Sequence, residues 1–348
     1  MKTLDQVEAR VIVNATNTPG DATNTFIITN PGSYYFVGNI TGAAGKNGIS
    51  VRANDVTLDL NGFALLSPGG ANLRGVDVPS AISNFTVRNG SVRGWSIAGV
   101  KADAATTLAE KLNLSGNAGG YGLMVGNGSM VRDCVASANA SGFYLPDRTM
   151  AVNCISTINT ANGFTATSYV LLSECTSSRN SGIGFLLGSS TSLSRCSATR
   201  NDLGGISGGT GCMIADSIAS TNTTDGIFAD SDSTIRNCTS LNNTRYGISV
   251  TTSCTVVANS CNANQSGIYT NGPTGTQGER NNIDGNSCDR NQFGIEVHGL
   301  LNFVVRNSAT GNSSLNFSIP NASLNKVGPI DEGSGTITST SPWANFGH

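Results

Sequence analysis

Glu296 and His298 are separated by a single residue in the stretch "FGIEVHGL". An offset of two places both side chains on one face if this stretch is a β-strand. A carboxylate beside an imidazole can orient the ring and exchange protons with a bound molecule. His298 is also the only histidine of the sequence apart from the terminal His348. The pair is therefore the first candidate for acid–base catalysis.

Three further residues belong to the same candidate site. Tyr269 and Asn271 precede Glu296 and His298 by 27 residues and keep the same offset of two. Arg280 lies in "TNGPTGTQGERN", whose glycines and proline predict an inserted loop over the site. An aromatic ring can support a sugar, and a guanidinium can bind its polar groups. We predict a catalytic pair with three substrate-binding neighbours: Tyr269, Asn271 and Arg280.

Asp225, Asp230 and Asp232 form a separate acidic group in "NTTDGIFADSD". Three carboxylates could supply the paired acids of a glycoside hydrolase, or the oxygen ligands of Ca²⁺. The nine cysteines show no C-x-x-C spacing with histidine partners, as a zinc site would require. We expect no metal and no cofactor, with calcium at these aspartates as the alternative.

A second polar cluster is expected nearer the N-terminus, where Arg52, Asp77, Lys101 and Asp103 occupy corresponding outward positions. For this cluster, as for the one around His298, the alternative is a solvated outer face with ordinary polar residues.

These candidates are positioned by an internal repeat. The position of Cys238 in "RNCTSLNNTRYGISV" recurs at spacings of 20 or 21 residues, with one spacing of 27. Five residues after each of these positions stands an asparagine: Asn139, Asn159, Asn180, Asn201, Asn222, Asn243, Asn264, Asn291 and Asn312. Gly-Phe or Gly-Ile follows in most repeats. Self-similarity at this period predicts a solenoid.

The residues inside each repeat predict strands. Apolar residues alternate at period two, as in Ile295-Glu296-Val297, and no segment is long enough for a helix of ten residues. We therefore predict an all-β, right-handed parallel β-helix of roughly thirteen coils with about 21 residues per coil. Stacked asparagines would form an internal amide ladder, and cysteine would pack in the core. We expect glycine to supply positive φ angles at the turns.

The pattern resembles the right-handed parallel β-helix repeat proteins of the pectin-lyase-like superfold. Three segments are also similar to an uncharacterised group of secreted bacterial β-helix proteins: "MKTLDQVEAR", "PGSYYFVGNITGAAGKNGISVRANDVTLDLNGFAL" and "SPWANFG". The resemblance implies a secreted or cell-surface protein, exported behind a cleaved signal. It also implies that a polysaccharide binds along one outer sheet.

The ends of the repeat and the cysteines give further expectations. We predict an N-terminal cap over 1–45, the β-helix over 46–319, and a C-terminal tail over 320–348 that packs on the last coil. Most cysteines share interior positions, which favours a column of free thiols over disulfides. Cys261 and Cys288 fall in neighbouring coils and are the pair that could best form a disulfide.

Composition excludes some partners. Charged residues make up 12% of the chain and the net charge is −2, which leaves no basic surface for nucleic acid. No apolar run has the length of a membrane span, and the first twenty residues lack the apolar stretch of a signal peptide. Either the protein is cytosolic or this form of the chain is mature or trimmed.

Two functions fit these observations. The first is an exported protein that engages polysaccharide, as a binding protein or as a lyase or hydrolase. The second is a non-catalytic structural or adhesive surface protein, monomeric or associating end to end or side by side. A groove lined by Tyr269, Glu296 and His298 would favour the first.

Overall fold

The computed structural model describes residues 10–104, 106–270, 278–333 and 335–348. These residues form short β-strands, and the one helical element among them is the 3-10 turn η1 (Ala322–Leu324). No helix in this part of the chain has the length and apolar character needed to cross a membrane. The chain divides into two compact units, Met1–Ala166 and Thr167–His348.

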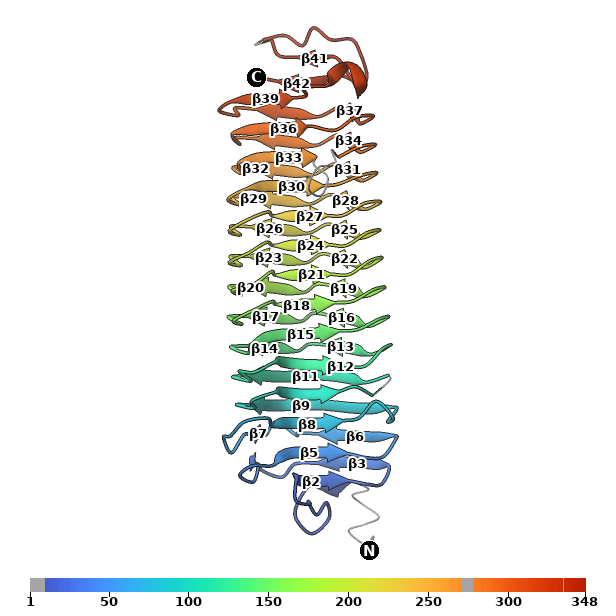
Figure 1. Ribbon diagram of the computed structural model, residues 1–348, viewed down its shortest axis with the longest axis vertical. Coiled ribbons are helices and arrows are strands. Elements are labelled where there is room, and N and C mark those ends of the chain that lie inside the picture. Colours follow the sequence, from blue (N-terminus) through green and yellow to red (C-terminus); the bar gives the residue numbers. More distant parts are fainter. Residues whose placement is uncertain (1–9, 105, 271–277, 334) are drawn as a thin grey trace, which may run out of the picture. The chain divides into compact units, whose positions relative to one another are not determined.

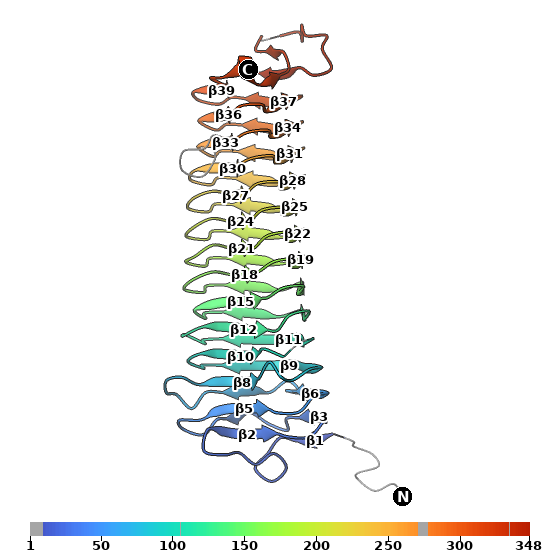
Figure 2. The same ribbon diagram turned by 45° about the vertical axis from the view of Figure 1, so that its right-hand side comes forward.

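In the second unit the strands stack in three columns, and neighbours within a column pair in parallel (Figure 1). The first column carries the candidate site: β21 (Phe185–Leu187), β24 (Ile206–Gly208), β27 (Ile227–Ala229), β30 (Tyr246–Val250), β33 (Ser266–Thr270), β36 (Phe293–Val297) and β39 (Leu315–Ser318). The second contains β19 (Leu171–Ser173), β22 (Ser192–Ser194), β25 (Met213–Ala215), β28 (Thr234–Arg236), β31 (Thr255–Val257), β34 (Asn282–Asp284), β37 (Phe303–Val305) and β40 (Lys326–Val327). The third contains β20 (Thr176–Ser178), β23 (Ser197–Thr199), β26 (Ile218–Ser220), β29 (Thr239–Leu241), β32 (Ser260–Asn262), β35 (Ser287–Asp289), β38 (Ser308–Thr310) and β42 (Asn345–Gly347). Figure 2 separates the first column from the second.

The first unit is built in the same way. One column contains β2 (Asn24–Ile28), β5 (Asn47–Val51), β8 (Arg74–Val78), β10 (Ala98–Ala102), β12 (Tyr121–Val125), β15 (Ser141–Leu145) and β18 (Phe164–Ala166). The longer strands β9 (Phe85–Arg93) and β11 (Leu108–Ser115) pair in parallel on the other side of the coils. The predicted all-β parallel solenoid with about 21 residues per turn is therefore confirmed.

The number of turns differs from the prediction. The chain forms about 15 turns, against the thirteen expected. One turn that the repeat did not reveal includes β2, which pairs in parallel with β5 although its sequence lacks the Cys and Asn positions. The division into cap, β-helix and tail stays a prediction.

In-register stacking creates the core. Ile227, Ile248, Ile268 and Ile295 lie directly over one another in β27, β30, β33 and β36, and all four are fully buried. Burying a side chain of this size stabilises the fold by about 1.5–3 kcal/mol. The period-two alternation thus turns every second residue of these strands inward and leaves the others on the outer face.

The predicted amide ladder is confirmed within each unit. In the second unit each ladder asparagine from Asn180 to Asn291 donates from Nδ2 to Oδ1 of its equivalent in the next coil, as Asn201 does to Asn222 at 3.1 Å and Asn222 to Asn243 at 3.0 Å. The same Oδ1 also accepts the backbone N–H of the preceding asparagine. In the first unit the ladder runs from Asn117 through Asn139 to Asn159. These bonds satisfy polar groups that have no access to water.

The expected positive φ angle occurs at turn glycines such as Gly116 and Gly311, but the expectation is wrong for the glycine of the Gly-Ile/Phe pair. Gly205, Gly226 and Gly247 do not have positive φ angles. The left-handed residue is the one before each ladder asparagine, such as Arg200 (φ 56°) or Thr221 (φ 59°). Glycine is required at its own position because a Cβ on Gly205 would lie 2.6 Å from both the Asn222 amide nitrogen and the Gly226 carbonyl oxygen.

The nine cysteines are buried and carry free thiols, as predicted, and Cys261 and Cys288 form no disulfide. The sulfur of Cys196 also acts as a hydrogen-bond acceptor, which the sequence did not suggest. The backbone N–H of Cys175 donates to the Cys196 sulfur, and that of Cys196 donates to the Ser217 hydroxyl. The backbone N–H of Cys238 donates to Oδ1 of Asn259, so a sulfur, a hydroxyl and an amide oxygen each serve as the acceptor at this position in different coils.

Candidate site on the outer face of β30, β33 and β36

Parallel register brings the predicted site residues onto one face. Ser249 pairs with Tyr269, and Tyr269 pairs with Glu296, so these three residues occupy one outward position in successive coils. His298 follows β36 directly, two residues after Glu296. The sequence prediction that Tyr269, Glu296 and His298 share a face is therefore correct in geometry, although their roles stay predictions.

Two tyrosines and the histidine form an aromatic shelf, defined here as Tyr246, Tyr269 and His298. The rings of Tyr246 and Tyr269 stack with centroids 4.0 Å apart and planes within 9° of parallel. The His298 imidazole continues the row, 5.3 Å from the Tyr269 ring and tilted by 54°. A row of flat side chains on a sheet surface offers a stacking platform to a ring-shaped ligand.

The Glu296 carboxylate lies beneath the histidine. Its Oε1 is 3.4 Å from His298 Nε2, and its Oε2 accepts a hydrogen bond from the Ser266 hydroxyl. Glu296 is largely buried, with 12% of its side chain exposed, whereas 39% of the His298 side chain is exposed. In the tautomer that donates from Nε2 to Glu296, Nδ1 keeps its lone pair. His298 could then accept a proton from a molecule bound on the shelf.

An ion pair flanks the other end of the shelf. Both carboxylate oxygens of Asp225 accept from Arg245, at 2.7 and 2.8 Å, and the guanidinium carbon lies 4.7 Å from the centre of the Tyr246 ring. Burial, together with a hydrogen bond to Tyr269, raises the pKa of Tyr246 to about 12. The bond to Asp225 raises the pKa of Arg245. Tyr246 therefore stays protonated at physiological pH.

The remaining predicted members of the site lie elsewhere or outside the description. Asn271 lies outside the described residues. Arg280 forms an ion pair with its neighbour Glu279 at 3.3 Å, and 60% of its side chain is exposed. Its backbone has a φ of 56° and its N–H donates to the carbonyl of Leu300, so it occupies a bend between strands. The structure gives the Arg280 guanidinium no contact with Glu296 or His298 among the described residues.

The three aspartates do not form a shared site. Asp225 is occupied by Arg245, whereas Asp230 accepts from the Thr251 hydroxyl at 2.9 Å and from the Ser231 backbone N–H at 2.7 Å. The hydrogen bond from the Ser231 N–H contributes most to lowering the pKa of Asp230, and the bond from Thr251 lowers it further. Within the described ranges no group of three potential metal-ligating side chains occurs, at these aspartates or elsewhere.

The residues of the cluster expected in the first unit are divided among three ion pairs, although Asp77 and Lys101 lie opposite each other in β8 and β10. Arg52 binds Asp21 at 2.9 Å, and Asp77 lies 3.5 Å from Arg74. Lys101 pairs with Asp103. Among the described residues, Arg52 forms its ion pair with Asp21 and not with Asp77 or Asp103.

Comparisons with known proteins agree with this architecture. Residues 149–277 match a family model described as a right handed beta helix region. The A-module of the mannuronan C-5 epimerase AlgE6 from Azotobacter vinelandii superimposes with a TM-score of 0.65 at 15% identity, over 80% of this chain and 90% of that one. The A-module of AlgE4 from the same organism gives 0.52 at 16% identity, over 83% and 87%. The chain has the fold of a right-handed parallel β-helix. No curated protein matches it in sequence.

Three residues that contact the candidate site were not found from the sequence: Arg245, Tyr246 and Ser266. Tyr246 and Ser266 occupy the position before the repeated glycine and pair with each other. That position was available from the repeat, because "YGI", "SGI" and "FGI" stand at corresponding places. The ion pair between Arg245 and Asp225 had no such signal, since the two residues belong to turns of different coils.

Proposed function

We propose that this β-helix protein binds a polysaccharide on the aromatic shelf and that His298 exchanges a proton with it. The observation that carries the proposal is the row of Tyr246, Tyr269 and His298 on one outer face, with the Glu296 carboxylate 3.4 Å from the imidazole. Aromatic rings bind the C–H faces of sugars, and neighbouring charged groups bind their hydroxyls.

The spacing of the coils supports a chain-like ligand. Neighbouring strands lie about 4.8 Å apart, close to the length of one pyranose unit. Successive sugars could therefore meet successive coils, with one ring over Tyr269 and the next beside His298. The flanking guanidinium of Arg245 is 53% exposed and could donate to sugar hydroxyls while it remains paired with Asp225.

The chemistry of the site favours elimination over hydrolysis. A glycoside hydrolase needs two available carboxyl groups at one site, about 5–5.5 or 6.5–9.5 Å apart. Glu296 is engaged by Ser266 and faces His298, and Asp225 is engaged by Arg245. A single imidazole base suits removal of the C5 proton beside the carboxylate of a uronate sugar. The C4–O bond then breaks as the C4=C5 double bond forms, and the leaving oxygen takes a proton from the imidazolium.

The comparisons support a uronate polymer as the substrate class. The two structural neighbours are named as mannuronan C-5 epimerases, and mannuronan is a polymer of uronate sugars. Their identity to this chain is 15–16%, so the substrate class is a proposal. Within it, Arg280 and Asn271 keep their predicted roles in binding the substrate. Export to the cell surface or medium follows from the proposal, since such polymers are extracellular.

A glycan panel tests this function. The purified protein is mixed with polymannuronate, homogalacturonan and a neutral glucan, and both binding and release of unsaturated or reducing-end products are measured. We expect a uronate polymer to bind and to yield unsaturated products. His298→Ala should abolish turnover but keep binding, whereas Tyr269→Ala should weaken binding about tenfold.

Two matched variants serve as controls. His348→Ala removes the other histidine, and Tyr169→Ala removes a tyrosine that is 58% exposed elsewhere. Turnover that survives His298→Ala would overturn the catalytic role. If no glycan binds and the protein instead associates in scattering experiments, the structural or adhesive alternative would be favoured.

A further inference from the structure

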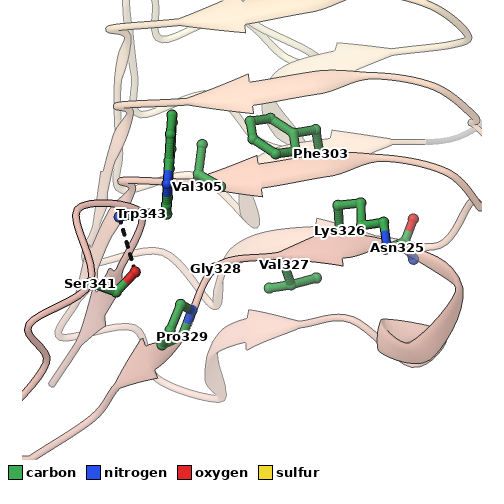
Figure 3. A pocket seen from close by; sticks show the side chains of 9 residues that line it. All are labelled: Phe303, Val305, Asn325, Lys326, Val327, Gly328, Pro329, Ser341 and Trp343. Carbon is green, nitrogen blue, oxygen red and sulfur yellow. Dashed lines mark hydrogen bonds between the residues drawn. The ribbon is translucent and has the colours of Figure 1, made fainter.

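A pocket of about 460 Å³ lies on a different strand column of the second unit, near the C-terminus (Figure 3). Strands β37 and β40 form its floor, and the segment before β42 forms one wall. The lining is mainly apolar: Phe303, Val305, Asn325, Lys326, Val327, Gly328, Pro329, Ser341 and Trp343. None of these residues belongs to the aromatic shelf.

Two aromatic rings give the pocket its shape. Trp343 and Phe303 meet edge to face, with ring centroids 6.1 Å apart and planes at 68°. Although they contact each other, Trp343 is 48% exposed and Phe303 is 39% exposed. Two large aromatic side chains in contact are seldom this exposed, because covering them with apolar atoms is favourable.

The tryptophan is held in place from behind. The Arg306 guanidinium carbon lies 5.3 Å from the centre of the Trp343 ring, and Arg306 is itself bound by the Asp284 carboxylate. The Trp343 backbone N–H donates to the Ser341 hydroxyl, and its carbonyl accepts from the Arg306 N–H. A Cβ at Gly328 would lie 1.8 Å from that carbonyl oxygen, so glycine allows the wall to approach the floor. The ring is therefore positioned before any ligand binds.

The charge of the pocket is not balanced. Lys326 pairs in register with Phe303 on the outward face, and its ammonium has no ion pair or hydrogen bond among the described residues. No carboxylate lines the pocket. The one amide, Asn325, is already used, since its Oδ1 accepts from Asn302 and its Nδ2 donates to the carbonyls of Gly299 and Asn321. The pocket thus combines apolar walls with a single unpaired cation.

We propose that this pocket binds a small aromatic carboxylate. The ring of the ligand would lie against Trp343, Phe303 and Pro329, where it finds apolar and aromatic contacts. Its carboxylate would reach the ammonium of Lys326. A sugar fits less well, because Val305, Val327 and Pro329 offer no partners for its hydroxyl groups. The proposal does not depend on the glycan function of the shelf.

Tryptophan fluorescence tests the proposal directly. The chain has two tryptophans, and Trp95 is fully buried in the first unit, so a change on ligand binding should come from Trp343. Titration with 3-phenylpropanoate should give a saturable change in emission. The neutral isostere 3-phenylpropanamide should bind roughly fivefold more weakly, because it lacks the charge that Lys326 attracts.

Variants separate the parts of the pocket. Trp343→Phe should remove the fluorescence change, and calorimetry on the same variant should show weaker binding. Lys326→Gln should bind both probes equally weakly, while Tyr269→Ala should bind 3-phenylpropanoate as the unaltered protein does. Circular dichroism and urea midpoints check that each variant folds. The proposal is overturned if the amide binds as tightly as the carboxylate, or if the emission change persists in Trp343→Phe.

Discussion

The Tyr246 ring stacks on the Tyr269 ring at 4.0 Å although the two residues are not opposite each other in the sheet. Tyr246 pairs with Ser266, and Tyr269 pairs with Ser249. The contact is therefore diagonal, and the small side chain of Ser266 leaves room for the Tyr246 ring to reach the next coil. The same serine donates to Glu296, so one small residue supports both the aromatic shelf and the carboxylate below it.

The raised pKa of Tyr246 predicts a pH dependence of stability. Burial is the first cause, and the folded-state value is about 12 against an ordinary value of 10.0. Because the protonated phenol is favoured in the folded state, its contribution is complete below pH 10 and is lost as the pH rises towards 12. Urea midpoints measured from pH 9 to 12 should therefore fall. In Tyr246→Phe the fall should be smaller, and an equal fall in both proteins would contradict this origin.

The amide ladder predicts a large loss of stability on truncation. Asn222 accepts from the backbone and side chain of Asn201 and donates to Asn243 and to the carbonyl of Ala198. Asn222→Ala would leave several of these buried groups without partners, at about 1–3 kcal/mol each. We expect the free energy of unfolding to fall by about 3 kcal/mol or more. Thr244→Ala, an exposed change in the next coil, should stay within about 0.5 kcal/mol of the unaltered protein in urea unfolding.

The sequence predicted the fold well because a solenoid repeats each structural requirement in every coil. Identical offsets of Cys, Asn and Gly-Ile showed that these residues serve the scaffold, and the coordinates place Asn222 and Ile248 in that scaffold as expected. The prediction that failed was the reason why glycine precedes Ile or Phe in each repeat. A missing side chain at Gly205 is needed for space, and a sequence alone does not distinguish that need from a positive φ angle.

The candidate site could be predicted in part, because strand parity tells which residues share a face. That argument found Tyr269, Glu296 and His298. It missed Tyr246 and Ser266: the repeat shows that they occupy one position, but their diagonal contacts with Tyr269 and Glu296 depend on side-chain rotamers and not on register. Asp225 and Asp230, which looked available in the sequence, are bound by Arg245 and Thr251, and only the coordinates reveal that these partners are close.

Burial of the cysteines predicts low thiol reactivity. All nine thiols are buried, and burial raises the pKa of Cys238 to about 12 and that of Cys254 to about 11. Alkylation requires an accessible thiolate. With iodoacetamide at pH 8, mass spectrometry should detect almost no labelling of the native protein and nine labels after denaturation. Rapid labelling of any one cysteine in the native state would place that residue at the surface and contradict the interior column.

Space at the repeated glycine gives the last prediction. A Cβ on Gly205 would lie 2.6 Å from the Gly226 carbonyl oxygen and from the Asn222 amide nitrogen, so neither backbone nor ladder can move without breaking other hydrogen bonds. Gly205→Ala should therefore lower the free energy of unfolding by about 2 kcal/mol or more.

Gly38 has no atom within 4 Å of its hypothetical Cβ and no positive φ angle. Gly38→Ala should be neutral or slightly stabilising, since alanine restricts the unfolded chain. Urea unfolding of the two variants should therefore give shifts of very different size, and similar shifts would mean that glycine at position 205 is not selected by the close approach of the next coil.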